Sequence, residues 1–176
     1  MKSEHLKTNI LAAMFLCLGM VLPFLTGQIR QIGNMLLPMH IPVFLCGLIC
    51  GWRYGLAVGV MLPILRSVAF GMPVMYPNAV AMAFELATYG FGAGFLYERS
   101  HKKGVAALYG SLLIAMVLGR VVWGVAELLL LGIGTKGFTW EAFLAGALLR
   151  AIPGILLQLI VIPVIMMACN KANNVS

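Results

Sequence analysis

The chain has 176 residues, of which 62% are hydrophobic and only 10% are charged, and its mean hydropathy is +1.01. Soluble domains are roughly 45–50% apolar and about 25% charged, so this composition predicts an integral membrane protein and excludes a soluble catalytic or nucleic-acid-binding domain. The formal charge of +7 is explained by basic cytoplasmic loops and does not require a nucleic-acid partner.

Six apolar stretches follow one another with short loops between them, and a membrane span needs about 20 such residues. The stretches run over Asn9–Leu25, Leu36–Gly51, Tyr54–Gly71, Asn78–Tyr97, Val105–Gly134 and Ala142–Cys169. The second and third are short, and they are also compatible with one helical hairpin joined through Gly51 and Gly55. The sequence therefore predicts an all-α integral membrane protein whose six transmembrane helices form a single domain over residues 1–176.

The distribution of Lys and Arg predicts the orientation. If the N-terminus is cytoplasmic, the cytoplasmic side carries seven basic residues, and the outer loops carry only two, Arg30 and Lys136. The seven are Lys2, Lys7, Arg53, Arg99, Lys102, Lys103 and Lys171. Because basic residues concentrate in cytoplasmic loops, we expect both termini to be cytoplasmic.

Three arginines, Arg66, Arg120 and Arg150, lie within predicted spans. A charge at membrane depth costs at least ~2.5 kcal/mol on insertion scales, so such residues indicate a function or an ion pair. The spacing predicts that Arg66 pairs with Glu85, and that Glu127 pairs with Arg150. Arg120 is then left without an assigned partner, and we expect it to anchor a substrate.

Further polar residues share helix faces with these charges. They are Trp123 and Glu127 beside Arg120, and Asn78 and Tyr89 beside Glu85. One interpretation is a set of packing ion pairs. The other, which we favour, is a polar pocket open to the outside that takes a small polar or anionic solute. His40, at the outer mouth of the second span, is interpreted first as an interfacial residue and second as a ligand of this pocket.

Small residues recur at every fourth position in two places. In the second and third spans they are Gly47, Gly51, Gly55 and Gly59, a pattern that predicts close packing between helices inside the protein. In the first span Ala13 and Cys17 have the same spacing, and Ala12 lies beside them. This smooth strip is suited to contact with another membrane protein.

Three segments resemble a known family: Met39–Val43 (MHIPV), Gly51–Gly55 (GWRYG) and Phe84–Gly90 (FELATYG). With six short-looped spans and a basic loop between the fourth and fifth, the chain is similar to the substrate-binding S components of energy-coupling factor (ECF) vitamin transporters. It is nearest to the group that holds the riboflavin- and pantothenate-type S components.

The resemblance implies capture of a water-soluble vitamin or related micronutrient at the cell membrane, by the first loop and spans four to six. It also implies transport only with a transmembrane T component and two cytoplasmic ATPases, and it maps the family's contact with the T component onto Ala13 and Cys17. The candidate substrate-binding residues are Asn34, His40, Arg66, Asn78, Glu85, Tyr89, Arg120, Trp123, Glu127 and Arg150.

The substrate class stays open between two alternatives. The excess of arginine favours an anionic solute such as pantothenate. Tyr89, Trp123 and Trp140 also suit a flat heteroaromatic molecule, such as a flavin or a deazapurine precursor of queuosine.

Other functions are disfavoured by missing features. Ser67 and Ser111 lie in no G-x-S-x-G setting, so we expect no enzyme activity. The chain has no aspartate, and its four cysteines show neither redox nor zinc-site spacing, so we expect neither a cofactor nor a metal. A self-contained channel or secondary transporter is the main alternative, and it predicts an internal repeat that the sequence does not display.

Overall fold

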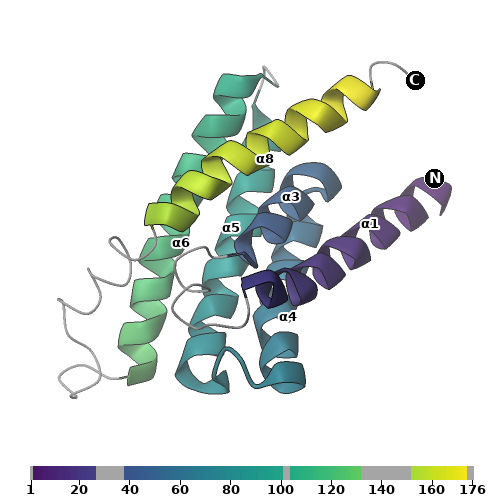
Figure 1. The fold of residues 1–176 in the computed structure, drawn as a ribbon. Coiled ribbons are helices and arrows are strands. Elements are labelled where there is room, and N and C mark those ends of the chain that lie inside the picture. Colours follow the sequence, from purple (N-terminus) through teal and green to yellow (C-terminus); the bar gives the residue numbers. More distant parts are fainter. Residues whose placement is uncertain (1, 27–37, 101–103, 132–151, 174–176) are drawn as a thin grey trace.

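The computed structural model describes residues 2–26, 38–100, 104–131 and 152–173, and all regular secondary structure in these ranges is helical. The elements are α1 (Lys2–Val21), the 3₁₀ helix η1 (Leu22–Thr26), α3 (His40–Cys50), α4 (Trp52–Phe70), the π-helical turn η2 (Met75–Ala79), α5 (Val80–Arg99), α6 (Val105–Leu131) and α8 (Ile152–Asn173) (Figure 1).

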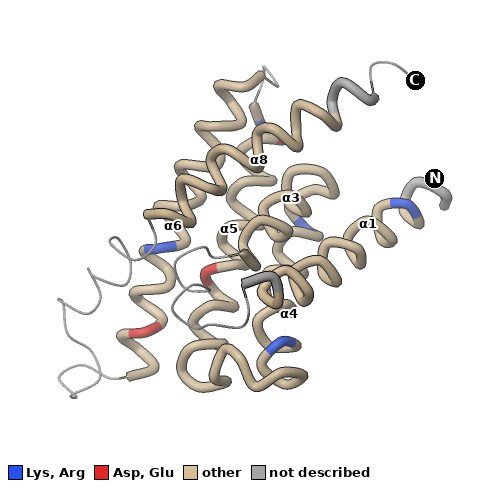
Figure 2. The backbone as a smooth tube through the Cα atoms, viewed as in Figure 1, with Lys and Arg blue, Asp and Glu red and all other residues tan. Residues whose placement is uncertain are grey.

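Among the described residues, five helical segments are long and apolar enough to cross a membrane. They contain α1, α4, α5, α6 and α8, and charged residues are sparse along them (Figure 2). The predicted class, an all-α membrane protein, is confirmed. The first helix begins at Lys2, earlier than the expected Asn9, and thus continues beyond the apolar stretch into the polar N-terminal segment.

The second predicted span, Leu36–Gly51, corresponds to a shorter apolar helix, which in the described residues begins at His40. Residues 38 and 39 form a turn, and Pro42 lies in the first turn of α3, where a missing backbone N–H is tolerated. The helix has 11 residues, which correspond to about 16 Å at 1.5 Å per residue, roughly half the thickness of the hydrocarbon core.

The hairpin alternative for the second and third stretches is confirmed. Between α3 and α4 stands Gly51 alone, with a φ of 96° that disfavours any residue bearing a Cβ. Past this turn the helices approach closely, since a Cβ on Gly55 would lie 2.6 Å from the Cα of Gly47.

The centre of the fold is α5, which contacts α3, α4 and α6 (Figure 1). Its backbone meets the glycines of the α3–α4 hairpin directly: a Cβ on Gly59 would lie 2.5 Å from the carbonyl oxygen of Leu86, and a Cβ on Gly90 would overlap the carbonyl of Gly55. The predicted internal packing of the recurring glycines is confirmed for Gly47, Gly55 and Gly59, whereas Gly51 serves the turn.

Two apolar clusters fill the space around α3 and α5. One joins them to α6 and α8 and contains Phe44, Tyr89, Leu112 and Ile162. The other joins them to α1 and α4, and its buried members are Ala12, Met39, Val43, Cys46, Val58, Leu62 and Leu86.

The strip of small residues on α1 is divided between two faces. Ala12 belongs to the core and is only 7% exposed, so its expected role in partner contact is wrong in this conformation. Ala13 and Cys17 lie on the exposed side of the same helix. The difference follows from helical geometry, because neighbouring residues are rotated by about 100° around the axis.

The close contact between α4 and α5 generates a stability prediction. Gly90→Ala places a methyl group on the backbone of α4 and should lower stability by about 1–3 kcal/mol, as overpacking does. Gly110→Ala is the matched control, since Gly110 lies within α6 with no neighbouring atom in reach of a Cβ, and alanine favours a helix by about 1 kcal/mol. Melting temperatures of the detergent-purified proteins test this. A Gly90→Ala protein that melts no lower than the parent contradicts the packing described.

Candidate functional site

A buried carboxylate on α5 is the centre of the polar interior. Glu85 is 2% exposed, and its Oε1 accepts a hydrogen bond of 2.7 Å from the hydroxyl of Tyr89. The same oxygen lies 3.1 Å from Nη1 of Arg120 and 3.8 Å from Nε2 of His40. We call these four residues the Glu85 cluster.

Three helices bring the cluster together. Glu85 and Tyr89 are four residues apart on one face of α5, Arg120 comes from α6, and His40 is the first residue of α3. Two neighbours fix the tyrosine ring. Phe44, one turn beyond His40, stacks on it with ring centroids 4.9 Å apart, and Gly119 leaves the space that the ring occupies, since a Cβ there would overlap it.

The burial of the cluster explains its partners. An unpaired carboxylate at this depth is strongly disfavoured, and removing one partner from a buried ion pair typically costs about 3–5 kcal/mol. The guanidinium of Arg120 neutralises the charge, while the hydroxyl of Tyr89 supplies a second donor to the same oxygen.

The predicted pairing of Arg66 with Glu85 is wrong. Gly59 of α4 packs against Leu86 of α5, so Glu85 lies near the level of Gly59. Arg66 is a further seven residues along α4, which is about 10 Å at 1.5 Å per residue. The expected absence of a partner for Arg120 is therefore also wrong, because Arg120 forms the pair that was assigned to Arg66.

Arg66 instead fastens the end of α1 to α4. Its Nη1 donates a hydrogen bond of 2.5 Å to the carbonyl oxygen of Met20. Its guanidinium also lies over the rings of Phe24 and Phe70, 5.2 and 5.4 Å from their centroids. These contacts are cation–π interactions, and they let the arginine remain buried at 3% exposure.

Several buried polar atoms, four in the Glu85 cluster and one on α8, have no hydrogen-bond partner in the part of the chain that the structure describes. They are Nε and Nη2 of Arg120, both ring nitrogens of His40, and Nε2 of Gln158 on α8. Buried polar groups are nearly always paired, so a group of such atoms is typical of a place where water or a ligand binds. The interfacial interpretation of His40 is wrong, since its exposure is only 1%.

Gln158 is a candidate that the sequence reasoning missed. It is 2% exposed, and it lies on α8 between Ile155 and Ile162, which pack in the apolar cluster that also contains Phe44 and Tyr89. A signal was present in the sequence, because Gln158 is an amide within an otherwise apolar run.

The remaining sequence candidates are distributed more widely. Trp123 and Glu127 continue α6 beyond Arg120 and are partly buried. Asn78 is exposed in η2, before α5 begins. Of the three residues expected to share a face, Glu85 and Tyr89 are joined by a hydrogen bond. Asn34, Trp140 and Arg150 lie outside the described residues, and so does one partner of the expected Glu127–Arg150 pair.

Within the described ranges, no group of three or more His, Cys, Asp or Glu side chains is placed to hold a metal ion.

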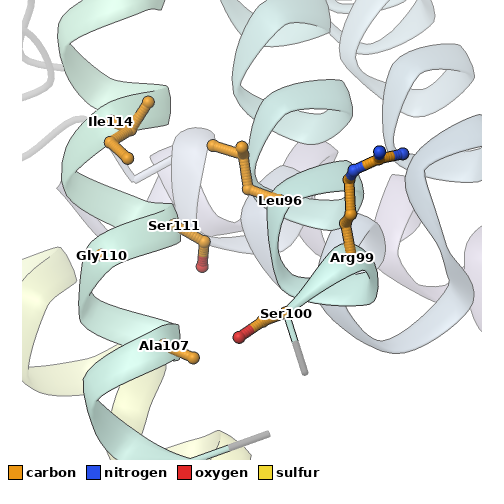
Figure 3. A pocket seen from close by; sticks show the side chains of 7 residues that line it. All are labelled: Leu96, Arg99, Ser100, Ala107, Gly110, Ser111 and Ile114. Atoms are coloured by element: carbon orange, nitrogen blue, oxygen red, sulfur yellow. The ribbon is translucent and has the colours of Figure 1, made fainter. Parts of the chain in front are cut away.

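A separate groove lies between the end of α5 and the start of α6 (Figure 3). Its volume is about 320 Å³, and its lining residues are Leu96, Arg99, Ser100, Ala107, Gly110, Ser111 and Ile114. Arg99 is 14 residues beyond Glu85, about 21 Å along the helix axis. The groove is therefore not part of the Glu85 cluster.

Comparison with known proteins identifies one family. The family model described as the substrate-specific component of ECF transporters matches residues 7–166, almost the whole chain. No curated protein and no solved structure matches. The resemblance seen in the sequence is thus confirmed at the level of the family.

The observed ion pair predicts strong coupling between Glu85 and Arg120. Glu85→Gln and Arg120→Gln should each destabilise the protein, and the double variant should cost less than the sum by about 0.5–3 kcal/mol. Combining Glu85→Gln with Arg66→Gln is the matched control, for which the two effects should add. Melting curves of the single and double variants measure the coupling in both double-mutant cycles. If the effects at Glu85 and Arg66 were coupled and those at Glu85 and Arg120 simply added, Arg66 and not Arg120 would be the partner of Glu85.

Proposed function

Because the chain belongs to the family of substrate-specific components of ECF transporters, we propose that it captures a water-soluble vitamin or related micronutrient outside the cell. A transmembrane T component and two cytoplasmic ATPases then supply the energy for uptake. Members of this family are substrate-binding subunits of transporters in the plasma membrane, and the apolar helices of this chain fit that location.

The observation that carries the proposal is the Glu85 cluster with its unpartnered buried atoms. A polar group inside an apolar helical protein is costly, so its retention indicates a function. Capture of a small polar molecule gives one, because the ligand satisfies the donors that the helices leave free. The substrate-binding residues that we propose are His40, Glu85, Tyr89, Arg120 and Gln158, with Asn34, Arg66, Asn78, Trp123, Glu127 and Arg150 as further members.

The proposed topology has six membrane helices in one domain and both termini in the cytoplasm. Seven cytoplasmic basic residues against two outside support it. In addition, α1 begins and α8 ends on the same side of the molecule (Figure 1). Glu85 is the sixth residue of α5, which runs inward in this topology, so the cluster lies in the outer half of the membrane.

The exposed face of α1 is the proposed contact with the T component. Ala13 and Cys17 lie on this face, and small side chains let two helix backbones approach closely. Of the small residues on α1, Ala12 is excluded from the contact by its burial.

We expect the purified protein to bind substrate without transporting it. The chain contains no G-x-x-x-x-G-K-[ST] loop for ATP, so liposomes that hold it alone should accumulate no vitamin. Addition of the T component and both ATPases with internal ATP should start uptake. Uptake by the protein alone would instead identify a self-contained channel or secondary transporter.

The partner face is tested by co-purification. A tagged parent protein should bring a T component and two ATPases with it from its native membrane, and Ala13→Leu should lose them, because the larger side chain separates the two backbones. The matched control is Ala57→Leu, which adds the same group to an exposed position of α4. Equal recovery of partners with both variants would place the contact on another face.

A further inference from the structure

Only one of the three guanidinium nitrogens of Arg120 has a partner within the described part of the protein. Nη1 lies 3.1 Å from Oε1 of Glu85, whereas Nε and Nη2 are buried without a hydrogen-bond partner. Nε and Nη2 form the side edge of the guanidinium plane, and their N–H groups point in parallel. That edge matches the two oxygens of a carboxylate, which accept two parallel hydrogen bonds from arginine.

The other unpartnered atoms are also mainly donors. Nε2 of Gln158 donates and cannot accept, and a neutral His40 ring has one donor and one acceptor nitrogen. The acceptor oxygen of Glu85 is already shared by Arg120 and Tyr89. A ligand that fits these side chains is therefore rich in acceptors, as a carboxylate is, because its two oxygens accept several hydrogen bonds and donate none.

The charge of the cluster disfavours a ligand with several negative charges. Glu85 and Arg120 cancel each other, so every charge of a ligand is added at membrane depth. A monocarboxylate adds one negative charge, which the unpartnered N–H groups can stabilise. A phosphate with two charges would add twice as much, which is more strongly disfavoured.

We propose that the substrate is a monocarboxylic acid, held as its carboxylate by the Nε–Nη2 edge of Arg120, with His40 and Gln158 as additional donors. This inference rests on the proposed function, and it selects the anionic class over a flat neutral heteroaromatic molecule. The sequence suggested an anion because Arg120 had no assigned partner for its charge. In the structure Glu85 already cancels that charge, and the unpartnered edge of the guanidinium selects the carboxylate instead.

The first experiment identifies the ligand on the unmodified protein. Detergent-purified protein is incubated with the small-molecule fraction of yeast extract, supplemented with the water-soluble vitamins. It is then washed and denatured to release the bound molecule for mass spectrometry. We expect one retained carboxylic acid. Its primary amide, made by coupling with ammonia, should bind at least about tenfold more weakly, because it replaces a charged acceptor pair with one neutral acceptor and a donor.

The second experiment uses variants of the same preparation. Arg120→Gln should bind the acid about ten- to hundredfold more weakly, the loss expected for a charge-assisted hydrogen bond, and Arg120→Lys should not restore binding, because an ammonium group lacks the parallel edge. Arg53→Gln is the matched control, since Arg53 is an exposed arginine at the start of α4 and lies over the ring of Trp52. Gel filtration checks that each variant is folded.

The outcomes separate this inference from the proposed function. A retained molecule without a carboxylate, an amide that binds as well as the acid, or full binding by Arg120→Lys overturns the carboxylate assignment and leaves the proposed function intact. A parent protein that retains no molecule contradicts both. A retained acid that is lost from the Arg120 variants and kept by Arg53→Gln supports the assignment.

Discussion

The structure depends on the burial of one carboxylate. Glu85 lies among apolar helices with 2% exposure, so its charge has to be neutralised within the protein. Arg120 of α6 neutralises this charge, and Tyr89 of α5 donates a hydrogen bond to the same oxygen. His40 of α3 lies 3.8 Å from that oxygen, so these side chains meet only if the three helices pack at the same level. The glycine contacts allow that approach, because Gly59 and Gly90 let the α3–α4 hairpin lie against the backbone of α5.

Stability and ligand capture are linked through the same residues. The ion pair with Glu85 holds the guanidinium of Arg120 in one orientation, and this fixes the direction of the edge that remains free. Tyr89 stacks on Phe44 and occupies the space at Gly119, and its hydroxyl donates a hydrogen bond to the carboxylate of Glu85. The ligand therefore meets donors that are already oriented, which reduces the entropy lost on binding.

Much of the fold could be predicted from hydropathy and spacing, but the partners of the charges could not. Apolar runs located the helices, and the spacing of Gly47, Gly55 and Gly59 located the close contacts. Sequence spacing gives the position of a residue along its own helix but not the level at which two helices pack against each other. Arg66 and Arg120 lie on the two helices that flank α5. Arg66 lies about 10 Å along α4 from the level of Glu85, whereas Arg120 lies beside it.

A crystal structure of the protein with its retained ligand tests the central claim most directly, namely that the Glu85 cluster is the substrate site. The ligand's carboxylate should lie within hydrogen-bonding distance of Nε and Nη2 of Arg120, with the Arg120–Glu85 pair unchanged. A ligand bound away from the Glu85 cluster, for example in the groove between Arg99 and Ser111, would contradict the claim.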